Sequence, residues 1–117
     1  MEVSEIPIPA VATIKVSKVG KSAVFETTVI QTTDNKYIYV MPIRHNNKLV
    51  SFAGQGLVKE FRILAGEDEA YLWRNITISK FIEAGSLFLR IKTKSAGIRV
   101  SSWMEQPKVP TNITQVM

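Results

Sequence analysis

Cysteine is absent from the 117-residue sequence, and histidine occurs once. Without cysteine the chain has no disulfide framework, no thiolate metal ligand and no cysteine nucleophile. The single imidazole, His45, excludes a site built from several histidines. It lies beside Asn46 and Asn47 in an expected turn, a position typical of an exposed bystander. The sequence therefore predicts neither a metal site nor a cofactor.

Long apolar runs are also lacking. No stretch approaches the roughly 18 apolar residues that a membrane-spanning helix requires. Residues 6–14 are apolar, but Pro7, Pro9 and Thr13 interrupt them, and the acidic start of the chain does not fit the basic start of a secretory signal. We expect no membrane partner. The prediction is an intracellular, cytoplasmic protein of cellular or viral origin, which agrees with the absence of cysteine.

Motifs for catalysis are missing as well. Gly54-Gln55-Gly56 precedes a possible helix, but no Lys-Ser or Lys-Thr pair follows at the spacing of a phosphate-binding loop, so a turn explains it. The acidic residues 67–69 lack the spaced pattern of a calcium-binding loop and indicate an exposed acidic loop. Neither a nucleophile–base pair nor a carboxylate dyad is visible. The sequence predicts a protein that is not an enzyme.

Basic residues outnumber acidic ones: 15 lysines and arginines against 10 aspartates and glutamates give a net charge of +5. Hydrophobic residues make up 45% of the chain, which is typical of one globular domain. We predict an extended lead-in at residues 1–10, a single β-rich domain at 11–104 and an extended tail at 105–117. Pro107 and Pro110 and the lack of an apolar period indicate the tail.

Hydrophobic residues between these ends recur mainly with a period of two, as in half-buried strands. Ala12, Ile14 and Val16 alternate with polar residues. Gly20 before Lys21 predicts a type II′ hairpin turn, because glycine tolerates a positive φ. Pro42 places the end of its strand at an edge or a bulge. We expect strands at about residues 12–16, 22–31, 36–44, 49–52, 71–78, 87–93 and 98–103, the first four as a meander and the last two as a hairpin.

Two segments favour short helices. Leu57, Val58, Phe61 and Leu64 fall at helical spacing, so residues 57–65 are predicted as a helix, although they also alternate tolerably as a strand. Residues 79–82 fit one turn of helix that begins at Ser79 and ends before Gly85. The predicted fold is mainly β, with roughly seven strands and one or two short helices. It would be a small antiparallel β-barrel of OB-like form or a curved sheet, such as a β-meander with a helix.

Cations and aromatics are interleaved in the expected final hairpin. If Leu89 and Ile91 face the core, alternation directs their neighbours outward. No acidic residue occurs between residues 84 and 104. Cations neutralise phosphates and aromatic rings stack on bases, so this pattern predicts a single-stranded nucleic-acid platform. Its residues are Phe88, Arg90, Lys92, Lys94, Arg99 and Trp103, and a weaker set in the first meander is Tyr37, Tyr39, Lys15 and Arg44.

Other interpretations of the same residues stay open. Exposed sheet faces carry Lys and Arg for solubility, Phe88 and Trp103 can be covered by other segments, and the two tyrosines can belong to a core layer. We predict binding of single-stranded DNA or RNA with little sequence preference. The alternative is a structural or interaction subunit of a viral or ribonucleoprotein assembly, a homo-oligomer among the possibilities, that uses β-edge pairing and its extended ends.

Overall fold

The computed structural model describes residues 1–54, 56–65 and 69–100. Regular structure in this part of the chain is β-sheet apart from one 3-10 turn. The elements are η1 (Val3–Glu5), β1 (Ala10–Lys18), β2 (Lys21–Thr33), β3 (Tyr37–Val40), β4 (Arg44–His45), β5 (Lys48–Leu49), β6 (Val58–Leu64), β7 (Ala70–Trp73), β8 (Thr77–Glu83), β9 (Ser86–Lys92) and β10 (Ile98–Val100). The mainly β class predicted from the sequence is confirmed, with more strands than the roughly seven expected.

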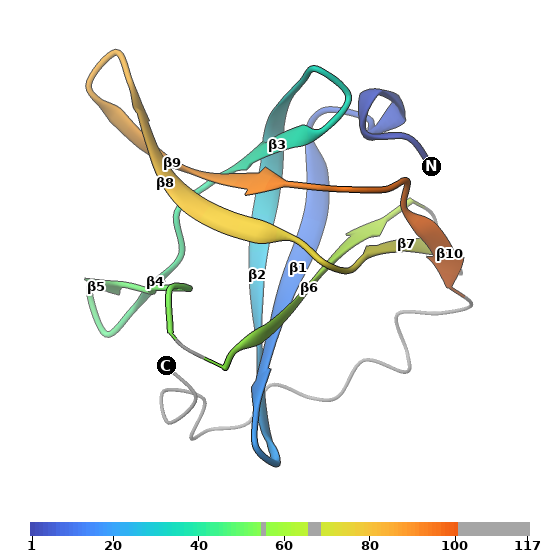
Figure 1. Cartoon of the computed structure of the whole chain (residues 1–117). Coiled ribbons are helices and arrows are strands. Elements are labelled where there is room, and N and C mark those ends of the chain that lie inside the picture. Colours follow the sequence, from blue (N-terminus) through green and yellow to red (C-terminus); the bar gives the residue numbers. More distant parts are fainter. Residues whose placement is uncertain (55, 66–68, 101–117) are drawn as a thin grey trace.

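Eight strands form one antiparallel sheet in the order β10-β7-β6-β1-β2-β3-β9-β8, and β4 pairs with β5 separately (Figure 1). The long β1 and β2 run through the middle of the molecule, and the sheet bends away on both sides of them (Figure 1). Residues 74–76 alone connect β7 to β8, which lie toward opposite ends of the sheet order. Among the described residues β8 and β10 do not pair, so the sheet is open and a closed barrel is not confirmed.

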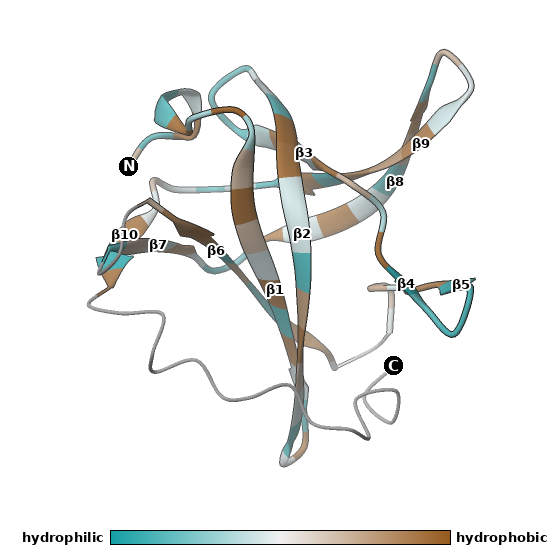
Figure 2. Ribbon diagram, turned by 180° about the vertical axis from the view of Figure 1, so that it is seen from behind, coloured by the Kyte–Doolittle hydropathy of each residue, from teal (hydrophilic) through white to brown (hydrophobic). Residues whose placement is uncertain are grey.

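The pairing of β1 with β2 confirms the strand pattern expected for residues 12–16. Ala12, Ile14 and Val16 are fully buried and lie opposite Thr27, Phe25 and Ala23 of β2. Hydrophobic and hydrophilic residues alternate along these strands (Figure 2). Because side chains of a strand alternate between faces, one face of this hairpin is set in the core.

Core residues of both bent halves meet inside the curve of the sheet. Phe61 and Trp73 come from one half, and Ile38 and Ile91 from the other; all are nearly or fully buried. Segments outside the main sheet complete this core through Val3, Ile6, Ile43, Val50 and Phe52. The predicted N-terminal lead-in thus contributes the η1 turn, whose Val3 is buried. In the described residues no helix has the length and apolar character needed to cross a membrane.

The helix predicted for residues 57–65 is wrong, because this segment is strand β6 in the sheet. Phe61 and Ile63 face the core, whereas Val58, which the helical pattern would also bury, is 62% exposed. Pairing with β1 on one side and β7 on the other satisfies the backbone. The helical turn predicted at residues 79–82 is wrong too, since these residues lie in β8, opposite β9.

The final hairpin predicted between residues 87–93 and 98–103 is also wrong. β9 lies between β3 and β8, and β10 crosses to pair with β7. The chain after β9 is held by other partners: Thr93 donates its amide to Lys36 O at 2.8 Å, and Gly97 donates its amide to Met1 O at 2.7 Å. Ile98 of β10 is 60% exposed and does not join the core.

The other predicted strands end earlier than expected or are divided into two elements. The strand predicted at 36–44 ends at Val40, so Pro42 lies outside the sheet. The fourth strand of the expected meander, residues 49–52, is replaced by the β4–β5 ribbon, and the strand predicted at 71–78 is divided between β7 and β8. In the β4–β5 ribbon Arg44 and His45 pair with Leu49 and Lys48 across a turn in which Asn46 and Asn47 both have positive φ.

The turn between β1 and β2 is centred one residue earlier than predicted. Lys18 pairs with Lys21, and both central residues have positive φ: 39° at Val19 and 77° at Gly20. Two successive positive φ angles define a type I′ turn rather than the type II′ turn expected. Val19 is 94% exposed, so no packing offsets the strain of a β-branched residue in this conformation.

Val19→Asn is expected to raise the free energy of unfolding by about 1 kcal/mol, because asparagine tolerates positive φ and valine does not. Urea denaturation followed by circular dichroism measures this change. Val19→Thr is the matched control, since it adds polarity but keeps the branched Cβ. An equal gain from both variants would contradict relief of backbone strain as the cause.

Candidate nucleic-acid interface

Strands β3, β9 and β8 bring aromatic and basic side chains onto one face of the sheet. Tyr37 and Tyr39 of β3 lie opposite Lys92 and Arg90 of β9. Arg90 and Phe88 in turn lie opposite Ser79 and Phe81 of β8. Residues directly opposite in a sheet share a face, and their strand neighbours Ile38, Leu89 and Ile91 face the core. We call this outer set the aromatic–cation face: Tyr37, Tyr39, Phe81, Phe88, Arg90 and Lys92.

Arg90 is held at the centre of this face by two rings. Its Cζ lies 5.1 Å from the centroid of Tyr37 and 5.2 Å from that of Phe81. Both distances are within the range of a cation–π interaction. In the described residues the two ion pairs are Arg74–Glu60 and Arg99–Glu69, so Arg90 pairs with no carboxylate there. The two rings therefore flank the guanidinium, which forms no ion pair with a carboxylate of the described residues.

Tyr39 is the buried member of the aromatic–cation face and packs against Phe81. It is 8% exposed, and its ring meets Phe81 edge to face at a centroid distance of 5.0 Å. Its hydroxyl lies 3.2 Å from Thr33 Oγ1, within hydrogen-bond range. Such burial makes Tyr39 a positioning residue rather than a stacking surface. Tyr37, Phe81 and Phe88 are half-buried and keep part of their rings accessible.

Lysines extend the positive charge past the ends of β3 and β9. Lys36 Nζ lies 5.3 Å from the centroid of Tyr37. Lys94 is exposed after β9, and both lysines line a hollow of about 380 Å³ together with Thr93 and Asn35. Glu2 also lines this hollow, where its carboxylate accepts a hydrogen bond from Asn35 Nδ2 at 3.0 Å. The predicted site residue Lys94 is thus adjacent to the aromatic–cation face.

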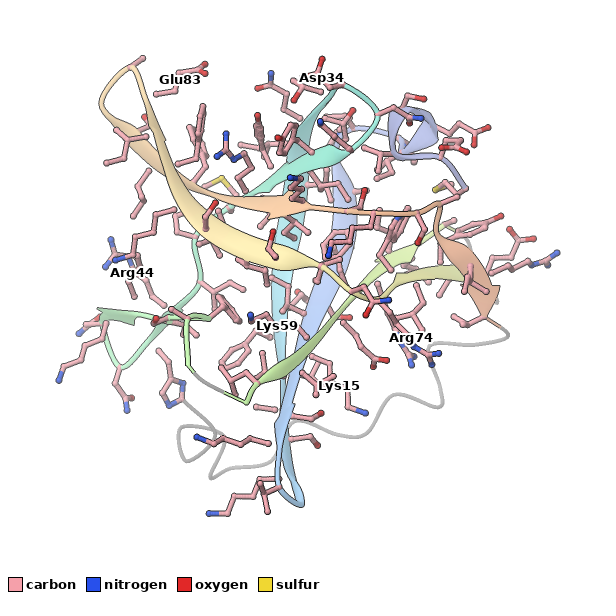
Figure 3. All side chains as sticks on the ribbon, viewed as in Figure 1. Lys15, Asp34, Arg44, Lys59, Arg74 and Glu83 are labelled. Atoms are coloured by element: carbon pink, nitrogen blue, oxygen red, sulfur yellow. The ribbon has the colours of Figure 1, made fainter. Side chains whose placement is uncertain are left out.

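Three other predicted site residues do not join this face. Arg99 lies on β10 opposite Tyr71, and its guanidinium contacts Glu69 Oε1 at 2.9 Å. Lys15 lies on β1, and Arg44 belongs to β4 of the separate β4–β5 ribbon (Figure 3). The grouping of Arg99 with Arg90 fails because it assumed that β9 and β10 pair. Trp103 lies outside the described residues.

Sequence reasoning missed Phe81 and the meeting of two separate segments. Phe81 and Ser79 lie on the same face of strand β8, whereas the sequence pattern predicts a helical turn for these residues. Tyr37 and Tyr39 were assigned to a set apart from Arg90, whereas the register places them directly beside it. The strand period alone identifies the outward residues of each segment, and only the strand order brings them together.

Side chains that could bind a metal ion do not cluster in the described residues. In residues 1–54, 56–65 and 69–100, His, Asp and Glu form no group of three or more that could hold a metal ion. Comparison of the chain with protein-family models, with curated proteins and with solved structures finds no match.

Proposed function

We propose that the protein binds single-stranded nucleic acid on the aromatic–cation face. The observation that carries this proposal is Arg90, which is clamped between Tyr37 and Phe81 on an outer sheet face with Phe88 and Lys92 beside it. A preorganised guanidinium loses little conformational freedom when it binds a phosphate. Aromatic rings on both sides of it offer surfaces on which unpaired bases stack.

Four residues of the face have distinct parts in this proposal. Phe88 and Tyr37 would stack on bases, and Arg90 and Lys92 would donate to phosphate oxygens. Lys36 and Lys94 would follow the backbone of the strand past the end of β9. In these roles the cations contact phosphates and the rings contact base faces, so no base edge is recognised by hydrogen bonds and we expect little sequence preference.

Phe88→Ala is expected to weaken binding of a mixed-sequence single-stranded oligonucleotide by about tenfold, because one stacked base is worth about 1–3 kcal/mol. Arg90→Ala should weaken binding at least as much, since it removes a phosphate contact and the clamp. It should also reduce the slope of log affinity against log salt by about 0.7. Fluorescence anisotropy with a labelled oligonucleotide at two salt concentrations measures both effects.

Arg99→Ala is the matched control, because it removes the same charge from β10, outside the aromatic–cation face. It should leave affinity within about twofold of the wild type, the change expected of a distant and screened charge. Equal losses of affinity from Arg90→Ala and Arg99→Ala would show that binding results from general charge attraction and not from the aromatic–cation face. Absence of binding by the wild-type protein at low salt would refute the proposed function.

A further inference from the structure

In the part of the chain that the structure describes, β8 forms a free edge of the main sheet, and it borders an apolar groove. Within residues 1–54, 56–65 and 69–100 the strand is last in the sheet order, with β9 on one side and no strand on the other. Among the described residues, the backbone hydrogen bonds outside the strand pairings include none from residues 77–83. The outward N–H and C=O groups of β8 therefore form a template to which a further strand can pair.

The groove lies between this edge and the segment that follows β5. It has a volume of about 370 Å³, and the residues that line it include Val50, Phe52, Ile78, Lys80 and Leu89. Phe52 and Leu89, each 3% exposed, belong to the core, so the groove opens onto apolar packing. Its volume is within the range of small ligand sites and accommodates side chains of an added strand.

Alternation along β8 defines the chemistry that such a strand would meet. Ile78 and Lys80 lie opposite Ile91 and Leu89, on the core side of the sheet, and Ile82 follows on the same side. Ile82 is 71% exposed, although it is a large aliphatic residue. The edge therefore presents an apolar residue, a cation and an apolar residue at alternate positions. Directly opposite residues of paired strands interact, and opposite charges stabilise the pair.

Lys80 argues against a second copy of the chain as the occupant. It is the middle residue of β8, so antiparallel pairing of two β8 strands about their centre would place Lys80 against Lys80. Like charges directly opposite each other destabilise a pair. An acidic side chain at the same position would neutralise Lys80, and no carboxylate lines the groove in the described residues.

We propose that β8 binds an extended peptide segment of a partner protein by strand addition. The segment carries an apolar, an acidic and an apolar residue at alternate positions. The outer residues pack on Ile78 and Ile82, and the carboxylate pairs with Lys80. Main-chain hydrogen bonds to the edge supply affinity, and the alternate side chains supply specificity. This site uses the core side of β8, whereas the aromatic–cation face uses the other side, so the inference does not depend on the proposed function.

A pair of labelled heptapeptides tests this site on the full chain. One is Thr-Val-Thr-Glu-Thr-Val-Thr, and the other has Lys in place of Glu. Fluorescence anisotropy should show tighter binding of the Glu peptide to the wild type. Lys80→Glu should weaken that binding by about tenfold and reverse the preference, because attraction across the pair becomes repulsion. N-methylation of alternate backbone nitrogens in the Glu peptide should abolish binding, because it removes strand pairing.

Lys92→Glu is the matched control, because it makes the same charge change on the opposite face of the neighbouring strand. It should leave peptide affinity unchanged and reduce oligonucleotide affinity. Equal binding of the Glu and Lys peptides to the wild type, or equal losses from Lys80→Glu and Lys92→Glu, would overturn the inference. A concentration-dependent dimer of the wild type that an excess of the Glu peptide disperses in light scattering would also overturn it, since a second copy would then occupy the edge.

Discussion

Phe61→Ala is expected to lower the free energy of unfolding by about 3–5 kcal/mol, the usual cost of removing a fully buried phenylalanine. Phe61 is fully buried and lies between Ile14 and Trp73 on the adjacent strands. Its ring is 5.9 Å from that of Trp73 at an interplanar angle of 51°. Domains of this size are stabilised by about 5–15 kcal/mol, so the loss is a large fraction of the total.

Urea denaturation followed by circular dichroism measures this loss, with Val58→Ala as the matched control. Val58 lies on the same strand but is 62% exposed, so its truncation should change stability by less than about 0.5 kcal/mol. The pair also distinguishes strand from helix, because the helical pattern places both residues on one buried face. Comparable losses at the two positions would contradict the strand.

Gly97→Ala is expected to cost about 1–3 kcal/mol of stability, as overpacking of a core does. A Cβ at this position would lie 2.5 Å from Cζ2 of Trp73 and 2.7 Å from Cε2 and Cη2. The backbone has little room to withdraw, because Gly97 exchanges two hydrogen bonds with Met1. Its amide donates to Met1 O at 2.7 Å, and its carbonyl accepts from the Met1 ammonium at 2.8 Å.

A double-mutant cycle with Trp73→Phe tests this cause. The smaller ring lacks the indole atoms nearest the added methyl group, so Gly97→Ala should cost much less in the Trp73→Phe background. The free energy of unfolding of all four proteins is measured by urea denaturation. An equal cost in both backgrounds would show that contact with Trp73 does not explain the requirement for glycine.

Strand positions could be predicted wherever polar and apolar residues alternate strictly. Ala12, Ile14 and Val16 were placed in the core, and Leu89 and Ile91 were assigned the buried face of their strand, as observed. The sequence predicts a helix where β6 lies, because Leu57, Val58, Phe61 and Leu64 fall at helical spacing. The same residues also alternate tolerably as a strand. Pairing with neighbouring strands decides whether such a segment forms a strand or a helix, and a neighbouring strand can be distant in the sequence.

The candidate site shows the same limit. The outward direction of Phe88, Arg90 and Lys92 follows from alternation, so the sequence supplied half of the aromatic–cation face. The other half depends on β3 and β8 as neighbours of β9. The short link of residues 93–97 fits a hairpin equally well, and its course toward β7 depends on Met1 and Trp73, which local spacing does not specify.

The place of β9 between β3 and β8 has a consequence for the order of events during synthesis. β1, β2 and β3 can pair as soon as they leave the ribosome, because adjacent segments join them. The far edge of β3 then waits for β9, whose Ile91 pairs with Ile38. Closure of this large loop is slow, because its entropic cost comes before the stabilising contacts form. We therefore expect folding in about milliseconds to seconds rather than microseconds. Until then Tyr37 and Tyr39 border an open strand edge, where a nascent chain is most exposed to aggregation.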